Sequence, residues 1–77
     1  ITAYIEEALA RADYRIVDHG FAATVRGLKG VIATGETLEA CRRELASVIE
    51  EWVLVRVARG LSVPALGRAV VKVRRAS

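Results

Sequence analysis

The chain has 77 residues, 53% of them hydrophobic, and a formal net charge of +3. This length allows one domain with a modest core, because so short a chain buries only about 60% of the surface that it exposes when unfolded. The single cysteine, Cys41, excludes a disulfide framework, and with one histidine, His19, the chain has no Cys/His cluster for a structural metal. We therefore expect oligomerisation to stabilise the fold.

The first predicted element is an amphipathic helix over residues 1–12. Its apolar side chains recur at the helical spacing of three and four residues. They are Ile1, Tyr4, Ile5, Ala8, Leu9 and Ala12. Glu7 and Arg11, four residues apart, lie on the outer side, where such a pair supports a helix.

Three short β-prone runs follow the helix, over residues 14–17, 21–26 and 31–34. Residues 18–20 form the first turn between them, and residues 27–30, bracketed by two glycines, form the second. Because both turns are short, the three strands should form an antiparallel meander.

A second helix is predicted from Leu38 to about Arg59, with Thr37 as its N-cap and Gly60 and Pro64 after its end. Seven apolar residues gather on one face of this helix and should pack on the sheet. They are Leu38, Cys41, Leu45, Val48, Ile49, Trp52 and Val55.

The stretch from strand 21–26 to the start of the second helix resembles the core of the HicB-like antitoxin family. That core reads strand, glycine-bracketed turn, strand, and a G-[DE]-T step into a long helix. Here the turn is Gly27-Leu28-Lys29-Gly30 and the step is Gly35-Glu36-Thr37. The resemblance covers residues 14–73, with residues 1–12 as a leading helix, so we expect one HicB-like domain over residues 1–77.

The resemblance implies an α+β fold with a partial RNase H-like architecture: helix, three-stranded antiparallel meander, long helix and final strand. The alternation of Ala69, Val71 and Val73 with their neighbours places that final strand at residues 69–74. It should lie parallel to strand 14–17 after a right-handed crossover.

No catalytic, cofactor or metal site is predicted, and we expect no enzymatic activity. Two-metal nucleases need several carboxylates that converge on the ions. Here Asp13 and Asp18 lie at strand ends, and most other acids are spread along the second helix. His19 is interpreted as a polar turn residue and Cys41 as a small core residue.

Charge is distributed unevenly along the chain. Residues 1–51 carry six basic and nine acidic side chains, whereas residues 52–77 carry six basic and none acidic. The basic tail either complements the acidic half, within the fold or across a subunit interface, or binds nucleic acid or an acidic partner. The candidate contacts for the second alternative are Arg68, Lys72, Arg74 and Arg75. The tail lacks the interleaved aromatic residues on which single-stranded nucleic acids stack, so we favour the first.

Three apolar residues fall outside the predicted core face of the second helix: Val53, Leu54 and Val57. Off-stripe apolar residues mark a surface that another chain covers. They predict the interface of a homodimer or a dimer of dimers. The alternative is that the first helix or the C-terminal linker covers them within one subunit.

The resemblance implies a non-catalytic antitoxin-type binding module that masks a small HicA-type ribonuclease toxin. No DNA-binding segment follows the last predicted strand, so we expect a short member of the family. The alternatives are a small nucleic-acid-binding protein that uses the basic tail, and an orphan HicB-like protein without a toxin. Without a predicted membrane span or signal peptide, a cytoplasmic location is expected.

Overall fold

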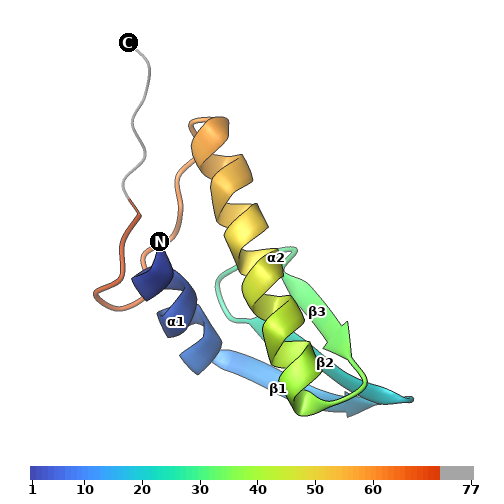
Figure 1. Cartoon of the computed structure of the whole chain (residues 1–77). Helices are drawn as coiled ribbons and strands as arrows, with labels where there is room; N and C mark the ends of the chain where they lie inside the picture. Colours follow the sequence, from blue (N-terminus) through green and yellow to red (C-terminus); the bar gives the residue numbers. More distant parts are fainter. Residues whose placement is uncertain (72–77) are drawn as a thin grey trace.

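A computed structural model describes residues 1–71, which form two helices and three strands (Figure 1). In chain order these are α1 (Thr2–Ala10), β1 (Ala12–Val17), β2 (Gly20–Val25), β3 (Ile32–Gly35) and α2 (Leu38–Ala58). The predicted α+β class is confirmed. The bounds of all five elements lie within two residues of those predicted.

The three strands form one sheet in the order β1-β2-β3, with both pairs antiparallel, as the meander prediction required. Tyr14 pairs with Ala23, which in turn pairs with Ala33. Between β2 and β3 the chain reverses through Gly27 and Gly30, at φ angles of 91° and 83°. Glycine suits both positions because it reaches positive φ without a steric cost.

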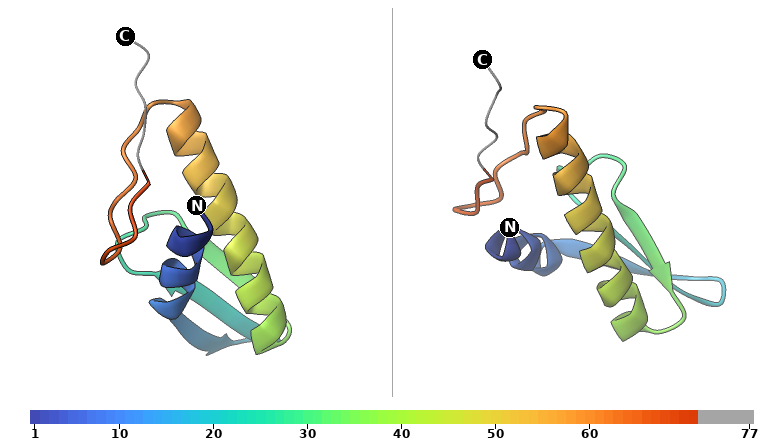
Figure 2. Two further views of the ribbon diagram at one scale, coloured as in Figure 1. Left: turned by 60° about the vertical axis from the view of Figure 1, so that its left-hand side comes forward. Right: turned by 45° about the horizontal axis from the view of Figure 1, so that its top comes forward.

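α2 crosses one face of the sheet, and α1 packs beside it (Figures 1 and 2). The Thr37 hydroxyl caps α2 by accepting a hydrogen bond from the backbone N–H of Ala40, at 3.0 Å. Close packing at this end requires Gly35, because a Cβ there would lie 2.8 Å from the Cα of Cys41. The start of α2 is thereby pressed against the end of β3.

The core follows a stripe of α2 at every fourth residue: Cys41, Leu45, Ile49 and Val53, all fully buried. The predicted stripe is therefore wrong at Leu38 and Val55, whose side chains are 49% and 45% exposed. A step of four residues exceeds one helical turn, so the buried stripe rotates around α2 along its length. Leu38 stands in the first turn, where α2 has only just left the end of β3.

The predicted final strand is not in the sheet over the described part, residues 69–71. Leu66 and Ala69 instead exchange two backbone hydrogen bonds, of 3.0 and 2.8 Å, across a tight turn at Gly67. This turn uses the backbone groups of Ala69 that a strand would offer to the sheet. The rest of that prediction, residues 72–74, lies outside the described residues.

Candidate binding surfaces

The three apolar residues predicted as an interface have different environments. Val53 is fully buried in the core, so its prediction as an interface residue is wrong. Val53 is buried because the core stripe rotates around α2 and includes it. Residues of α1 and of the segment after α2 belong to the same core cluster. Val57 is half-buried against that cluster, whereas Leu54 is 52% exposed. Of the three, Leu54 is the most accessible to a partner.

A groove of about 350 Å³ runs along the C-terminal half of α2. We call it the helix groove, and its lining is Val48, Glu51, Trp52, Val55, Arg56, Arg59 and Leu61. In Figures 1 and 2 this half of α2 extends past the sheet. Val55 and Leu61 are 45% and 44% exposed, so apolar surface is open to solvent there.

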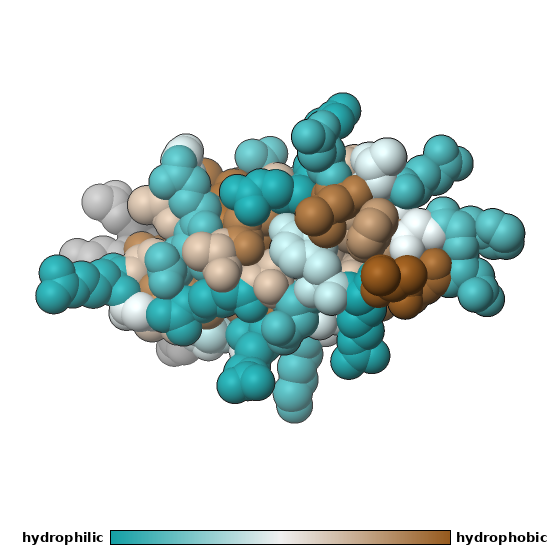
Figure 3. Space-filling view, turned by 90° about the horizontal axis from the view of Figure 1, so that it is seen from below, coloured by the Kyte–Doolittle hydropathy of each residue, from teal (hydrophilic) through white to brown (hydrophobic). Residues whose placement is uncertain are grey.

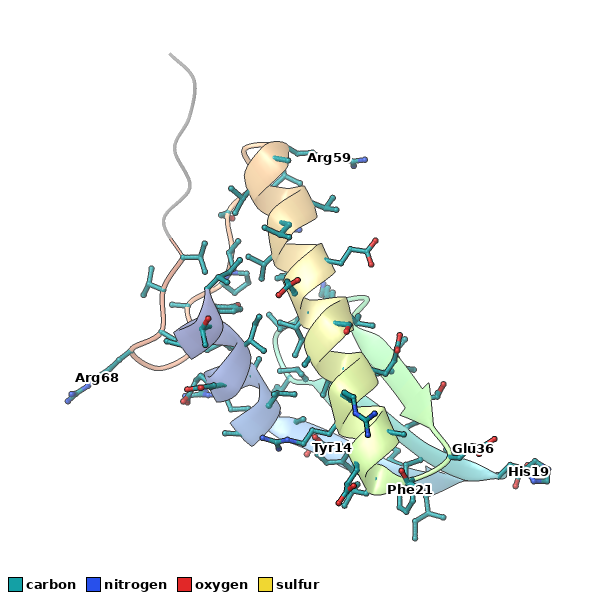
Figure 4. The ribbon with its side chains drawn as sticks, in the orientation of Figure 1. Tyr14, His19, Phe21, Glu36, Arg59 and Arg68 are labelled. Atoms are coloured by element: carbon teal, nitrogen blue, oxygen red, sulfur yellow. The ribbon has the colours of Figure 1, made fainter. Side chains whose placement is uncertain are left out.

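Arg56 makes two contacts within the helix groove. Its guanidinium carbon lies 4.9 Å from the centroid of the Trp52 ring, a cation–π distance, and its Nε donates a hydrogen bond of 2.7 Å to the carbonyl of Ser62. These contacts join α2 to the segment that follows it. Arg59 ends the helix and projects into solvent (Figure 4).

A second hollow, of about 340 Å³, lies where β1 turns into β2, and residues 17–21 and 34–36 line it. We define the hairpin-end surface as residues 16–21 and 34–36. Figure 4 shows His19, Phe21 and Glu36 at this end of the sheet. The side chain of Ile16 is 85% exposed, and the exposed Asp18 and Glu36 make the surface acidic as well as apolar. From below, apolar atoms reach the surface among charged side chains (Figure 3).

Individual titratable and nucleophilic residues fit structural roles. Cys41 is fully buried with its Sγ 3.7 Å from the carbonyl oxygen of Ala33, which confirms its prediction as a core residue. The hydroxyl of Tyr4 donates a hydrogen bond of 2.6 Å to the carbonyl of Pro64, and burial raises the pKa of Tyr4, an effect that Arg56 partly offsets. Within residues 1–71, no three His, Cys, Asp or Glu side chains gather as a metal site requires.

Of the four basic residues predicted as nucleic-acid or acidic-partner contacts, the structure places Arg68. It is exposed on the tight turn after Gly67 and points away from the body of the protein (Figure 4). Lys72, Arg74 and Arg75 lie outside the described residues. None of the described helices has the length and apolar character needed to cross a membrane.

Comparison with known proteins identifies the family. A crystal structure of TTHA0281 from Thermus thermophilus is similar, with a TM-score of 0.86 and 37% sequence identity, over 96% of this chain and 94% of that chain. No curated protein matches the chain. The family model described as UPF0150-like matches residues 3–64, from the first turn of α1 to the segment after α2. The chain therefore belongs to the UPF0150-like family.

Proposed function

We propose that this protein is a non-catalytic, HicB-like antitoxin-type module that associates with itself and masks a small ribonuclease of the HicA type. Membership of the UPF0150-like family supports the proposal. So does the glycine-bracketed turn followed by the Gly35-Glu36-Thr37 step, which here joins β3 to α2. The partial RNase H-like architecture and the cytoplasmic location belong to the same proposal.

The hairpin-end surface is the observation that carries the toxin-binding role. A ribonuclease that binds RNA carries a basic surface, so its inhibitor needs acidic groups beside apolar contact area. Asp18 and Glu36 supply the acidic groups, and the exposed Ile16 supplies an apolar contact at the tip of the sheet.

The test uses a small ribonuclease of the HicA type. Purified full-length protein should bind that ribonuclease and stop its cleavage of RNA. Ile16→Lys should weaken binding at least tenfold, because it places a cation against a basic partner. Ile32→Lys is the matched control, since Ile32 is also exposed, at 59%, but lies on β3 away from the hairpin end. Equal binding by wild type and Ile16→Lys would remove this surface from the proposal.

Self-association is the second part of the proposal. Leu54 stands exposed on α2, and the prediction that it contacts another copy is retained together with Val57. Closed twofold symmetry is the simplest arrangement, because one self-complementary patch then serves both copies. A homodimer or a dimer of dimers satisfies this requirement.

Nucleic-acid binding is the second candidate function, and the exposed Arg68 favours it. Binding through the basic tail would be electrostatic, so the affinity for a short single-stranded RNA should fall steeply as salt increases. A variant with Arg68, Lys72, Arg74 and Arg75 changed to alanine should then lose that affinity. Salt-independent or absent RNA binding would rule out this second candidate.

A further inference from the structure

We propose that the helix groove receives a second copy of this chain, with the two α2 helices crossing antiparallel about a twofold axis at Val55. This inference rests on the self-association in the proposed function and names the surface and geometry that produce it. Three observations carry it: the apolar stripe of the groove, the order of its charges, and the repulsion that other occupants would meet.

The apolar part of the helix groove forms a continuous stripe. Val48, Trp52 and Val55 are spaced by four and three residues, so they lie on one side of α2. That side flanks the core stripe instead of facing it, and the sheet does not extend this far along α2 (Figure 2). Leu61 adds exposed apolar surface from the following segment. The groove therefore has an apolar floor that a second helix can cover.

Two of the three charged residues of the groove, Glu51 and Arg59, lie at symmetric positions about Val55. The third, Arg56, contacts the Trp52 ring and the Ser62 carbonyl of its own chain. Glu51 lies four residues before Val55 and Arg59 four residues after it, on the same side of the helix. In an antiparallel pair centred on Val55, Glu51 faces the partner subunit's Arg59, and the symmetry repeats this ion pair. A parallel pair would place Glu51 against the same residue of the other copy. The charge order therefore selects the antiparallel arrangement.

Neither charge is satisfied within the described part of one chain. Glu51 and Arg59 are eight residues apart, or about 12 Å along the helix axis, too far to pair with each other. The ion pair found among residues 1–71 joins Arg11 to Glu7 on α1, at 2.9 Å. Both groove charges are thus open to a partner.

Other occupants match this groove poorly. A basic ribonuclease surface would complement Glu51 but repel Arg56 and Arg59, and a nucleic acid would complement the two arginines but repel Glu51. In a second copy related by the twofold axis, Glu51 and Arg59 lie in the reverse order on either side of the apolar centre. A second copy therefore complements Glu51 and Arg59 at once, and the closed pair leaves no open end for further addition.

Charge reversal in the full-length protein tests the geometry. Glu51→Arg places two cations opposite each other, and Arg59→Glu places two anions, so each should raise the dimer dissociation constant at least tenfold at low salt. The double variant Glu51→Arg/Arg59→Glu restores opposite charges and should dimerise within about threefold of wild type, an expectation that follows from the pairwise logic of a mutant cycle. Analytical ultracentrifugation measures the constants, and circular dichroism checks that each variant folds.

Glu50→Arg is the matched control, because Glu50 is the adjacent acid on α2 but lines a hollow shared with α1. It should leave the dissociation constant unchanged. Single reversals that dimerise like wild type, or a double variant as weak as the single variants, would overturn the antiparallel pairing. If dimers persist in every variant, self-association uses another face and the proposed function stands. If the pairing is confirmed but no ribonuclease binds, the toxin-masking role fails and the pairing stands.

Discussion

Tyr4 connects the first helix to the segment that follows the second. Its side chain is 2% exposed, and its hydroxyl donates a hydrogen bond of 2.6 Å to the carbonyl of Pro64, sixty residues away in the chain. Tyr14 provides a contrast, because its hydroxyl is buried without a hydrogen-bond partner among the described residues. The two tyrosines therefore allow a hydrogen-bonded hydroxyl to be compared with an unpaired one in the same fold.

Tyr4→Phe should lower the free energy of unfolding by about 0.5–1.5 kcal/mol at neutral pH, because one hydrogen bond is lost. Tyr14→Phe should cost less or stabilise, since it removes an unpaired buried hydroxyl. Urea unfolding of the three proteins measures both changes. Equal losses in the two variants would contradict the role given to the Tyr4 hydrogen bond.

The raised pKa of Tyr4 also predicts a pH dependence. Burial favours the neutral phenol, so the folded-state pKa lies above the unfolded value of 10.0. The stability from this group is complete below the unfolded pKa and is lost as pH rises through the folded one. Alkaline unfolding of the wild type should therefore include a component that Tyr4→Phe lacks. If the unfolding free energies of wild type and Tyr4→Phe changed in parallel above pH 10, this pH dependence would be contradicted.

At the scale of the elements, α2 holds the fold together through one narrow stripe. Leu45→Ala should cost about 2–5 kcal/mol of unfolding free energy, because Leu45 is fully buried and the change leaves a cavity. Leu38→Ala, at a site 49% exposed on the same helix, should change it by less than about 0.5 kcal/mol. Urea unfolding compares the two. Similar losses would mean that the first turn of α2 is packed more tightly than its exposure indicates.

The element bounds could be predicted from the sequence because their signals are local. Thr37 caps α2, and glycines mark the turn between β2 and β3. The burial of Val53 and the exposure of Val55 could not be predicted in this way. A helical wheel assumes one flat partner along the whole helix, whereas α2 is covered by the sheet at one end and by other segments at the other.

The candidate surfaces were predictable only in part. Leu54 was expected to be uncovered because it lies opposite the predicted core face of α2, and its 52% exposure agrees. No such signal in the sequence indicated the exposure of Ile16, since Ile16 lies on the same face of β1 as the half-buried Tyr14. It is exposed because the hairpin end of the sheet reaches past α2, and strand alternation carries no information about where a helix starts (Figure 1).

In the whole molecule, the two candidate surfaces lie at opposite ends. The hairpin-end surface is at the turn between β1 and β2, and the helix groove is on the half of α2 that extends past the sheet (Figures 1 and 2). A dimer built through the groove would leave both hairpin ends accessible. Self-association and ribonuclease binding are therefore compatible in one assembly, and a dimer could hold two ribonucleases.

The last prediction concerns stability as a property of the assembly. A domain of this size has a marginal core, so a dimer in which folding and association are coupled should gain stability with concentration. A tenfold increase in protein concentration favours the folded dimer by about 1.4 kcal/mol, which should raise the unfolding midpoint by roughly 3–6 °C. Differential scanning calorimetry at two concentrations measures this shift.

Leu54→Glu should reduce that shift, because it places a carboxylate on the exposed face of α2 next to the groove. Ile32→Glu is the control, since it adds the same charge at a side chain 59% exposed on β3, away from α2's outer face. The control should keep the concentration dependence of the wild type. A wild-type midpoint that does not move with concentration would show that one copy is stable alone, and an undiminished shift in Leu54→Glu would exclude Leu54 from the interface.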